Sequence, residues 1–229
     1  RAAFFASALI YLAGWMFFKF CGIVQEDKKI RPVNTRRTIR ALARNTRMFF
    51  RAPGMARAYA INFGYYSLRA MRYLYVPIVV IENGFSKDAL GWVLTLGIIP
   101  YLVLSEFMGR AVRRYGKSIW LMLGFGSFAL FSAGATVITG VPLLAIFVLW
   151  QISGALMESV HDLMFFDTVK KSDQARFYGI FRTSVNLPNV VAPILGAACI
   201  AIYGTTAAVW GVTAAIGAMS VGVLIGGRR

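Results

Sequence analysis

Residues 61–77, "INFGYYSLRAMRYLYVP", lie in an apolar stretch long enough to cross a lipid bilayer, and they carry Arg69 and Arg72 near its middle. An ionised side chain at the centre of a bilayer costs at least ~2.5–3.5 kcal/mol on insertion scales. We therefore expect both guanidinium groups to face a wet cavity or a charged partner, and not lipid. Other segments of the chain must then form the walls of that cavity or carry the charged partner.

The composition is that of a membrane protein. Of the 229 residues, 58% are hydrophobic and 15% are charged, whereas soluble domains are about 45–50% apolar and about a quarter charged. Cutting the sequence at charged and turn residues leaves segments near the ~20 residues that ~30 Å of hydrocarbon requires. These segments are residues 2–24, 58–81, 89–109, 118–138, 142–166, 177–203 and 207–227. We predict an all-α polytopic membrane protein with seven transmembrane helices.

The net charge of +16 is unevenly distributed along the chain. If the first segment runs from outside to inside, most of the 25 basic residues fall in inner segments. The outer segments hold only Arg1 and Lys87. The positive-inside rule then predicts a cytoplasmic C-terminus and a place in the plasma (inner) membrane. Since the cytoplasmic loops account for the basic excess, we expect the lipid bilayer as a partner and no nucleic acid.

Cysteine and histidine usage argues against a metal or a catalytic centre. Cys21 and Cys199 lie in different segments without a CxxC motif, and His161 is the only histidine. No ligand cluster for zinc or haem can be assembled from these residues. The nucleophile elbow, the Walker A sequence and the HExxH sequence do not occur either. We expect no metal, no cofactor and no enzymatic activity.

Residues 25–57 form a long basic connection after the first segment. Its apolar residues fall at helical spacing, with arginines mostly on the other side, which is typical of a helix in the headgroup plane. The apolar positions are Ile39, Leu42, Ala43, Thr46, Phe49 and Phe50. The alternative is a solvated linker whose charge only sets the topology. We predict a basic cytoplasmic linker that is partly amphipathic.

The inner loop "GRAVRRYGKS", residues 109–118, carries the most specific short motif. It resembles the G-x-x-x-D-R-x-G-R-R turn between the second and third helices of each half of major facilitator superfamily transporters. Gly109, Arg114 and Gly116 match, while Arg113 stands where that family usually has Asp. A glycine at each end would let the two helices reverse tightly, and the cations would anchor the turn at the membrane surface.

Residues 155–200 are similar to the tenth helix, basic loop and eleventh helix of the same superfamily, including a Pro-Ile-Leu-Gly sequence at 193–196. The seven segments then resemble helices six to twelve. Residues 1–24 correspond to helix six, 25–57 to the central linker and 58–229 to the C-terminal six-helix bundle. The resemblance implies twelve helices in the complete protein. We therefore expect this chain to work with an N-terminal half that it lacks.

The resemblance implies a secondary active transporter of a small solute, proton-coupled and working by alternating access. In that family, helices seven and ten line the central cavity. They correspond here to residues 58–81 and 142–166, whose polar residues recur at three- and four-residue spacing. The predicted substrate-binding residues are Asn62, Tyr65, Tyr66, Arg69, Arg72, Tyr73 and Gln151, and the predicted proton-coupling residues are Glu158, His161 and Asp162.

We expect one of the two arginines to pair with Glu158 or Asp162, which lie one helical turn apart, across the cavity. In one interpretation the carboxylate exchanges a proton while the arginine binds an anionic substrate group. In the other, the pair is permanent and only holds helices seven and ten together.

A second set of residues is predicted to form a cytoplasmic gate. Salt bridges at this level hold the cytoplasmic side shut in the superfamily. Asp167 is the candidate for the acid that the loop lacks, with Glu106 as the alternative. The full predicted set is Glu106, Gly109, Arg113, Arg114, Gly116, Asp167 and Arg182. Topology signalling alone is the simpler interpretation of these charges.

A seven-helix membrane receptor or sensor is the alternative function. It would share the outer N-terminus and the inner C-terminus. However, the last segment has no lysine to hold retinal, and a basic linker such as residues 25–57 is unusual after the first helix of such bundles. The substrate and the direction of transport stay open. The arginines favour a substrate with a carboxylate, phosphate or hydroxyl group.

Overall fold

The computed structural model describes residues 12, 13, 16, 35–158, 160–203 and 207–226. The chain divides into two compact units, residues 1–41 and 42–229. In the first unit, residues 12, 13, 16 and 35–41 are helical. The remainder of the predicted span 2–24, and residues 25–34, lie outside the described residues. All contacts reported below are within the second unit.

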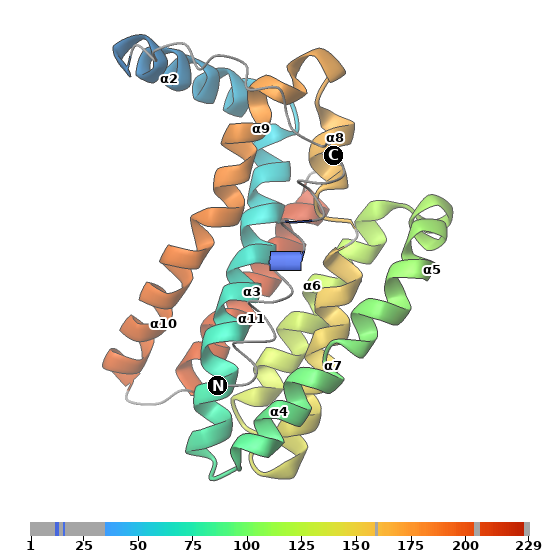
Figure 1. Cartoon of the computed structure of the whole chain (residues 1–229), viewed down its shortest axis with the longest axis vertical. Helices are drawn as coiled ribbons and strands as arrows, with labels where there is room; N and C mark the ends of the chain where they lie inside the picture. The colour runs from blue at the N-terminus through green and yellow to red at the C-terminus, as the bar shows by residue number, and fades with distance from the viewer. Residues whose placement is uncertain (1–11, 14–15, 17–34, 159, 204–206, 227–229) are drawn as a thin grey trace. The chain divides into compact units, whose positions relative to one another are not determined.

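The described part of the chain is helical and contains no strand, which confirms the all-α prediction. The helices, labelled in Figure 1, are α2 (Thr35–Arg51), α3 (Met55–Glu82), α4 (Lys87–Leu96), α5 (Ile99–Tyr115), α6 (Lys117–Ala135), α7 (Val141–Glu158), α8 (Leu163–Thr168), α9 (Lys171–Asn186), α10 (Pro188–Tyr203) and α11 (Ala207–Gly226).

Six predicted membrane segments correspond to these helices. Three segments are single helices, α3, α6 and α11, and three are pairs in which one helix follows another: α4 with α5, α7 with α8, and α9 with α10. By length and composition, four stretches of the described chain can cross a membrane: residues 87–104, 117–135, 141–168 and 171–203. Residues 209–225 form a shorter apolar helix. The longest single helix, α3, is the one that carries Arg69 and Arg72.

Two of the interruptions are caused by proline. Pro100 lies in the first turn of α5, and Pro188 is the first residue of α10. Proline has no N–H for the helical ladder, and its ring clashes with the carbonyl four residues earlier. The segments predicted as continuous at 89–109 and 177–203 are therefore each two helices in succession.

The interruption between α7 and α8 contains no proline. Residues 160–162 form a turn in which the Met157 carbonyl accepts hydrogen bonds from the backbone N–H groups of Val160 and His161, both at 3.0 Å, and lies 3.1 Å from Nδ1 of His161. α8 begins at Leu163, directly after Asp162. The whole stretch 141–168 is long and apolar enough to cross a membrane, and the placement of Glu158 and Asp162 one turn apart stays a prediction.

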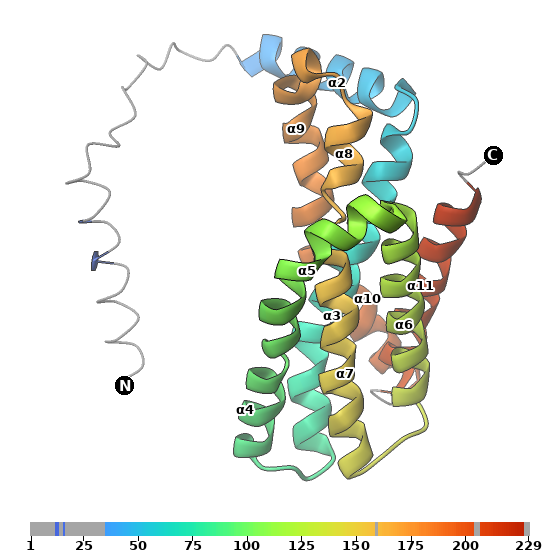
Figure 2. The same ribbon diagram turned by 90° about the vertical axis from the view of Figure 1, so that its right-hand side faces the viewer.

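α3 runs through the middle of this unit, with α9 and α10 on one side of it and α7 on the other (Figure 1). α6 packs against both α7 and α11. The α3–α4 and α6–α7 turns lie toward one end, and the α5–α6 and α8–α9 turns toward the other (Figure 2). Successive membrane segments are therefore antiparallel, as the alternation of basic and neutral loops predicts.

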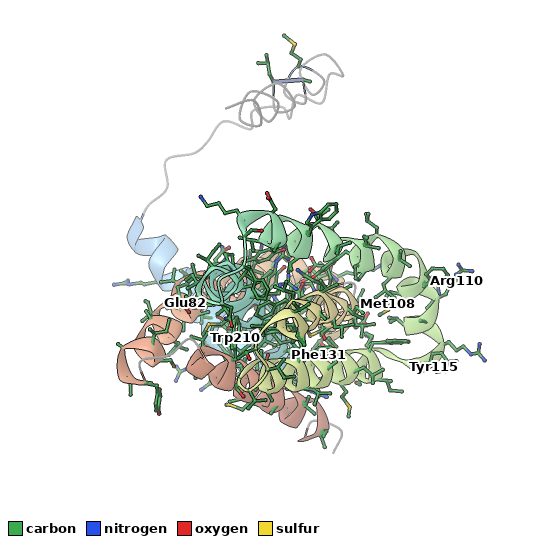
Figure 3. All side chains as sticks on the ribbon, turned by 90° about the horizontal axis from the view of Figure 1, so that it is seen from below. Glu82, Met108, Arg110, Tyr115, Phe131 and Trp210 are labelled. Atoms are coloured by element: carbon green, nitrogen blue, oxygen red, sulfur yellow. The ribbon has the colours of Figure 1, made fainter. Side chains whose placement is uncertain are left out.

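The main core lies where α3, α6, α7 and α11 meet. Its largest side chains are fully buried and include Phe128, Trp150 and Trp210. In Figure 3, Trp210 lies among the helices, whereas Arg110 points away from them. Side chains of this size interlock through edge-to-face and tilted contacts between rings, which fixes how the helices pack.

A second, smaller core joins the end of α2 to α8 and α9. Phe49 is fully buried there, and the rings of Phe165 and Phe181 stack at a centroid distance of 4.4 Å. Leu42 and Phe50 of α2 are exposed, so only part of its predicted apolar face packs on protein. A helix is present where the amphipathic pattern predicts one. Its place in the headgroup plane stays a prediction.

The two glycines of the "GRAVRRYGKS" loop behave differently. Gly116 has φ of 83° and is the residue between α5 and α6, a conformation that favours glycine. Gly109 lies inside α5, and a Cβ added there would meet no atom within 4 Å. The helix reversal therefore requires one glycine, and the expectation that Gly109 shares this role is wrong.

Candidate functional site

The polar stripe predicted on α3 divides into a buried half and a half that lines cavities. Asn62, Tyr65 and Arg72 are buried, with exposed fractions of 0%, 1% and 3%. Tyr66, Arg69 and Tyr73 line open space instead. The split arises because a stripe this wide covers more than one face of the helix, and α3 packs against several neighbours. Only part of the stripe is accessible to a solute.

Arg69 and Glu158 form an ion pair between α3 and the end of α7. Nη1 of Arg69 lies 3.2 Å from Oε2 and 3.3 Å from Oε1 of Glu158. Tyr65 donates its hydroxyl hydrogen to the same Oε2. The two charged side chains remain 36% and 40% exposed. This is one of the four pairings that the sequence predicts, and its exposure means that the carboxylate can exchange partners with solvent or solute.

Arg72 has quite different surroundings. Its Nη1 donates to the hydroxyl of Tyr101 at 3.2 Å, and its guanidinium carbon lies 4.8 Å from the centre of the Tyr73 ring. Nε and Nη2 are buried without a hydrogen-bond partner in the described part of the chain. Gly154 of α7 makes room for it, since a Cβ at that position would come within 2.9 Å of Nη1. Arg72 does not pair with Glu158 or Asp162.

His161 occupies the turn between α7 and α8 and is 2% exposed. Its Nδ1 can only donate to the Met157 carbonyl, so the remaining nitrogen is free to change role. That nitrogen, Nε2, lies 3.3 Å from the hydroxyl of Tyr66 and 3.4 Å from Oδ1 of Asp162. A neutral ring accepts from Tyr66, whereas a protonated ring donates toward Asp162. Glu158 and His161 thus contact α3 directly, and Asp162 contacts His161.

The other two predicted binding residues are buried. Asn62 donates from Nδ2 to Oγ of Ser184 in α9 at 2.8 Å, and its Oδ1 has no hydrogen-bond partner among the residues described. Gln151 of α7 is nearly buried beside Gly97, where a Cβ would collide with the Gln151 amide. Asn62 joins α3 to α9, and Gln151 closes one end of a cavity.

Two cavities meet at Arg69 and Tyr73, which line both of them. The larger, of about 610 Å³, lies between α3, α9 and α10. The smaller, of about 380 Å³, lies between α3, α7 and the α4–α5 junction. The larger is lined by Tyr66, Arg69, Ala70, Tyr73, Leu74, Arg182, Val185, Asn189 and Pro193. The smaller is lined by Arg69, Tyr73, Pro77, Leu94, Gly97, Ile98, Tyr101, Gln151 and Glu158.

The predicted gate residues are not gathered in one place, because they come from α5, the α5–α6 turn, α8 and α9. Asp167 of α8 forms an ion pair with Lys117, the first residue of α6, while Arg113 and Arg114 are exposed. Arg182 lines the larger cavity beside Arg69. The side chain of Glu106 lies outside the described residues. Asp167 therefore pairs with a cation at the α5–α6 turn, and that cation is Lys117.

Several contacts were not predicted from the sequence. Tyr101 binds Arg72, Ser184 binds Asn62, and Asn189 lines the larger cavity. Tyr101 directly follows Pro100. The proline indicates that the predicted segment is interrupted here, so the sequence did mark the position of Tyr101 as unusual. Ser184 and Asn189 had no signal, because single polar residues are common in membrane helices and their direction depends on how α9 and α10 pack. Among the described residues, no group of three His, Cys, Asp or Glu side chains could hold a metal ion.

Comparison with known proteins places this arrangement in context. The family model described as Major Facilitator Superfamily matches residues 62–228, which begins at Asn62 and includes every helix from α4 to α11. The match covers well over half of the chain and contains both cavities. No curated protein matches the chain.

Proposed function

We propose that this chain, which belongs to the major facilitator superfamily, carries the C-terminal helices of a proton-coupled secondary transporter. Members of this superfamily are membrane transporters and not enzymes, so the chain is an integral membrane protein with a transport role. The seven-helix receptor or sensor is correspondingly not favoured. Beyond membership of the family, we propose three features: the coupling ion, the residues that bind the solute, and the side of the membrane on which each loop lies.

The observation that carries the proposal is the Arg69–Glu158 pair. It joins α3 to α7 where the two cavities meet, and both partners are more than a third exposed. A purely structural pair would be expected to be enclosed, because solvent weakens an ion pair. An exposed pair inside a membrane protein can open when the carboxylate takes a proton or when a solute replaces it at Arg69. That exchange links proton uptake to solute binding.

His161 and Asp162 supply the second part of the proposed coupling. Protonation of His161 would replace the contact to Tyr66 with one to Asp162, at 3.3 Å and 3.4 Å respectively. Tyr66 lines the larger cavity, so a change at His161 reaches the solute site directly. The proposed substrate-binding residues keep the predicted set, with Arg72 and Asn62 as buried supports for the accessible residues.

Alternating access is supported by the interruptions in the membrane segments. Three of the six segments contain a turn, at residues 97–98, 160–162 and 187. Such breaks let half of a helix tilt while the other half stays packed. The Lys117–Asp167 pair is the proposed cytoplasmic gate, because it joins the α5–α6 turn to α8 and is partly exposed. Glu106, Arg113 and Arg114 are its proposed neighbours.

The proposed assembly follows the twelve-helix plan of the superfamily. Residues 1–24 would be helix six, residues 25–57 the cytoplasmic linker and residues 58–229 the C-terminal bundle. An N-terminal half would close the two cavities from the other side. The C-terminus would lie in the cytoplasm and the protein in the plasma membrane, since the basic residues gather at the inner ends of the segments.

The test is transport in vesicles that contain the full transporter with this chain. Labelled sugars, amino acids, organic acids and sugar phosphates are offered with and without an imposed pH gradient. We expect one class to accumulate with the gradient, and Glu158→Gln to abolish accumulation while exchange of internal for external solute continues. Glu82→Gln is the matched control, because Glu82 is exposed at the far end of α3. Accumulation by Glu158→Gln at the wild-type level would make the pair structural.

A further inference from the structure

We infer that the larger cavity is a site for an oxyanion, so that the transported solute carries a carboxylate or a phosphate group. This inference rests on the proposed function, because it names the substrate class of that same site. The site is formed by α3, α9 and α10. Its positive character depends on Arg182, which the sequence pattern places with the gate residues.

The charge of the cavity wall is the first observation. Two arginines, Arg69 from α3 and Arg182 from α9, line the cavity, and its lining contains no Asp or Glu. Arg182 makes no ion pair with any acid in the described part of the chain. Glu158 balances the charge of Arg69 from the side of the smaller cavity. The charge of Arg182 is balanced by no acid in the lining of the larger cavity. A guanidinium group beside apolar helices is stabilised by an anion close to it.

The geometry of Arg69 is the second observation. Arg69 uses only Nη1 for Glu158, so its other nitrogens remain for a ligand. The rings of Tyr66 and Tyr73 hold its guanidinium carbon at centroid distances of 5.8 Å and 5.6 Å. A guanidinium held between rings presents a fixed fork, which matches the two oxygens of a carboxylate or phosphate. Sugars and other neutral solutes do not require such a fork.

The rest of the lining limits the size and nature of the solute. Asn189 and the hydroxyl groups of Tyr66 and Tyr73 provide uncharged polar contacts, and Ala70, Leu74, Val185 and Pro193 provide an apolar wall. A volume of about 610 Å³ lies within the ~300–1,000 Å³ typical of small-molecule sites. A small organic anion with an uncharged body fits both the volume and the lining.

The shared position of Arg69 adds a consequence that can be measured. Glu158 holds Arg69 from the side of the smaller cavity, and the oxyanion would hold it from the larger one. The carboxylate of Glu158 therefore weakens the attraction of Arg69 for the ligand. Removing its charge by Glu158→Gln is expected to tighten anion binding, even though the same change abolishes coupling.

The experiment measures binding to the purified full transporter in zwitterionic lipid, without any transport step. The probes are succinate against succinamide, and glucose 6-phosphate against glucose. We expect an anion of at least one pair to bind and its neutral counterpart not to bind. Arg69→Gln and Arg182→Gln should each weaken binding about tenfold to a hundredfold. Arg182→Lys should recover part of the loss, which separates a lost charge from misfolding.

The matched control is Arg176→Gln. Arg176 lies on the same helix as Arg182 but donates to Asn45 of α2 at 2.6 Å and 2.8 Å, away from the cavity. It should bind anions like wild type. Failure of both succinate and glucose 6-phosphate to bind more tightly than their neutral counterparts, or unchanged binding by Arg182→Gln, would overturn the inference. Stabilisation by phosphatidylglycerol vesicles alone, with no soluble anion effective, would overturn it as well and identify a lipid headgroup as the occupant.

The two proposals fail in different ways. Anion binding without proton-driven accumulation would leave the oxyanion site in place and reject the coupling. Proton-driven accumulation of a neutral solute, with no anion bound, would keep the proposed function and reject the oxyanion site.

Discussion

The contact of α3 with α7 and the contact of α6 with α11 differ in almost every physical respect. The first carries an ion pair whose members are 36% and 40% exposed. The second is lined by buried side chains such as Phe128 and Trp210, and its Ser132 and Thr213 hydroxyls donate to carbonyls of their own helices. In a bilayer, apolar side chains gain little from leaving lipid, so helices associate through close packing. Charged side chains need water or a partner.

This difference separates the two roles of the bundle. The contact of α11 with α6 and with the Phe147 and Trp150 rings of α7, which we call the packed contact, depends on shape. The α3–α7 contact at Arg69, which we call the charged contact, depends on which partner Arg69 has. Changes in the packed contact should therefore lower stability and leave coupling intact. Changes in the charged contact should do the reverse.

The largest expected effect is on transport, from Arg69→Met. This change leaves Glu158 with Tyr65 alone and removes the guanidinium from both cavities. We expect proton-driven accumulation to fall by about a hundredfold, equivalent to about 3 kcal/mol. The free energy of unfolding should change by less than about 1 kcal/mol, because the pair is partly solvated. Transport assays and thermal unfolding in detergent measure the two quantities.

Arg110→Met is the control for that experiment, since Arg110 is exposed on α5 and points away from the bundle (Figure 3). It should leave accumulation within about twofold of wild type. Loss of folding in Arg69→Met with retained coupling in the folded fraction would show that the charged contact is structural.

The next effect is on stability, from Trp210→Ala. Trp210 is 1% exposed and contacts Trp150 and Phe147 at ring centroid distances of 5.0 Å and 5.6 Å. Its removal leaves a cavity that the packed contact cannot close, at a cost of about 3 kcal/mol. Trp92→Ala is the matched control, because Trp92 is 65% exposed and should cost little. Equal melting temperatures of the two variants would contradict the comparison.

A smaller effect is expected from Gly217→Leu in α11. A Cβ at residue 217 would lie 3.0 Å from Cβ of Ala129 and 3.2 Å from the carbonyl oxygen of Phe125, both on α6. A longer side chain would force the helices apart, at about 1–3 kcal/mol. Gly222→Leu on the same helix meets no atom at its Cβ and should be neutral or stabilising. Unfolding by heat in detergent compares them, and a destabilised Gly222→Leu would refute the explanation by packing.

Much of the fold could be predicted from the sequence. Segment lengths and the alternation of basic loops give the number and direction of the six membrane segments that α3 to α11 form, because both follow from bilayer thickness and surface charge. The breaks are harder to predict. Pro100 and Pro188 signal two of them, but the turn at residues 160–162 contains no proline and has no periodic signature.

The candidate site was predictable in kind but not in detail. Helical spacing selects Arg69 and Glu158 as possible partners, and the structure pairs them. The same spacing treats Arg72 as equivalent to Arg69, although three steps of about 100° along the helix leave the two side chains about 60° apart. Which of the two is buried depends on Tyr101 and Gly154, which come from other helices. Arg182 is assigned to the larger cavity for the same reason, through the packing of α9 on α3.

The smallest expected effect tests whether a charge contact outside the cavities behaves like the Arg69–Glu158 pair. Lys117 and Asp167 are 30% and 55% exposed, so solvent screens their attraction. A double-mutant cycle of Lys117→Gln and Asp167→Asn should give a coupling of less than about 1 kcal/mol in unfolding. If the pair is a gate, the single variants should instead raise the rate of exchange between the two sides. A coupling well above that limit would mean that the pair holds the bundle together, and that exposed charges and packed side chains are not divided between separate roles.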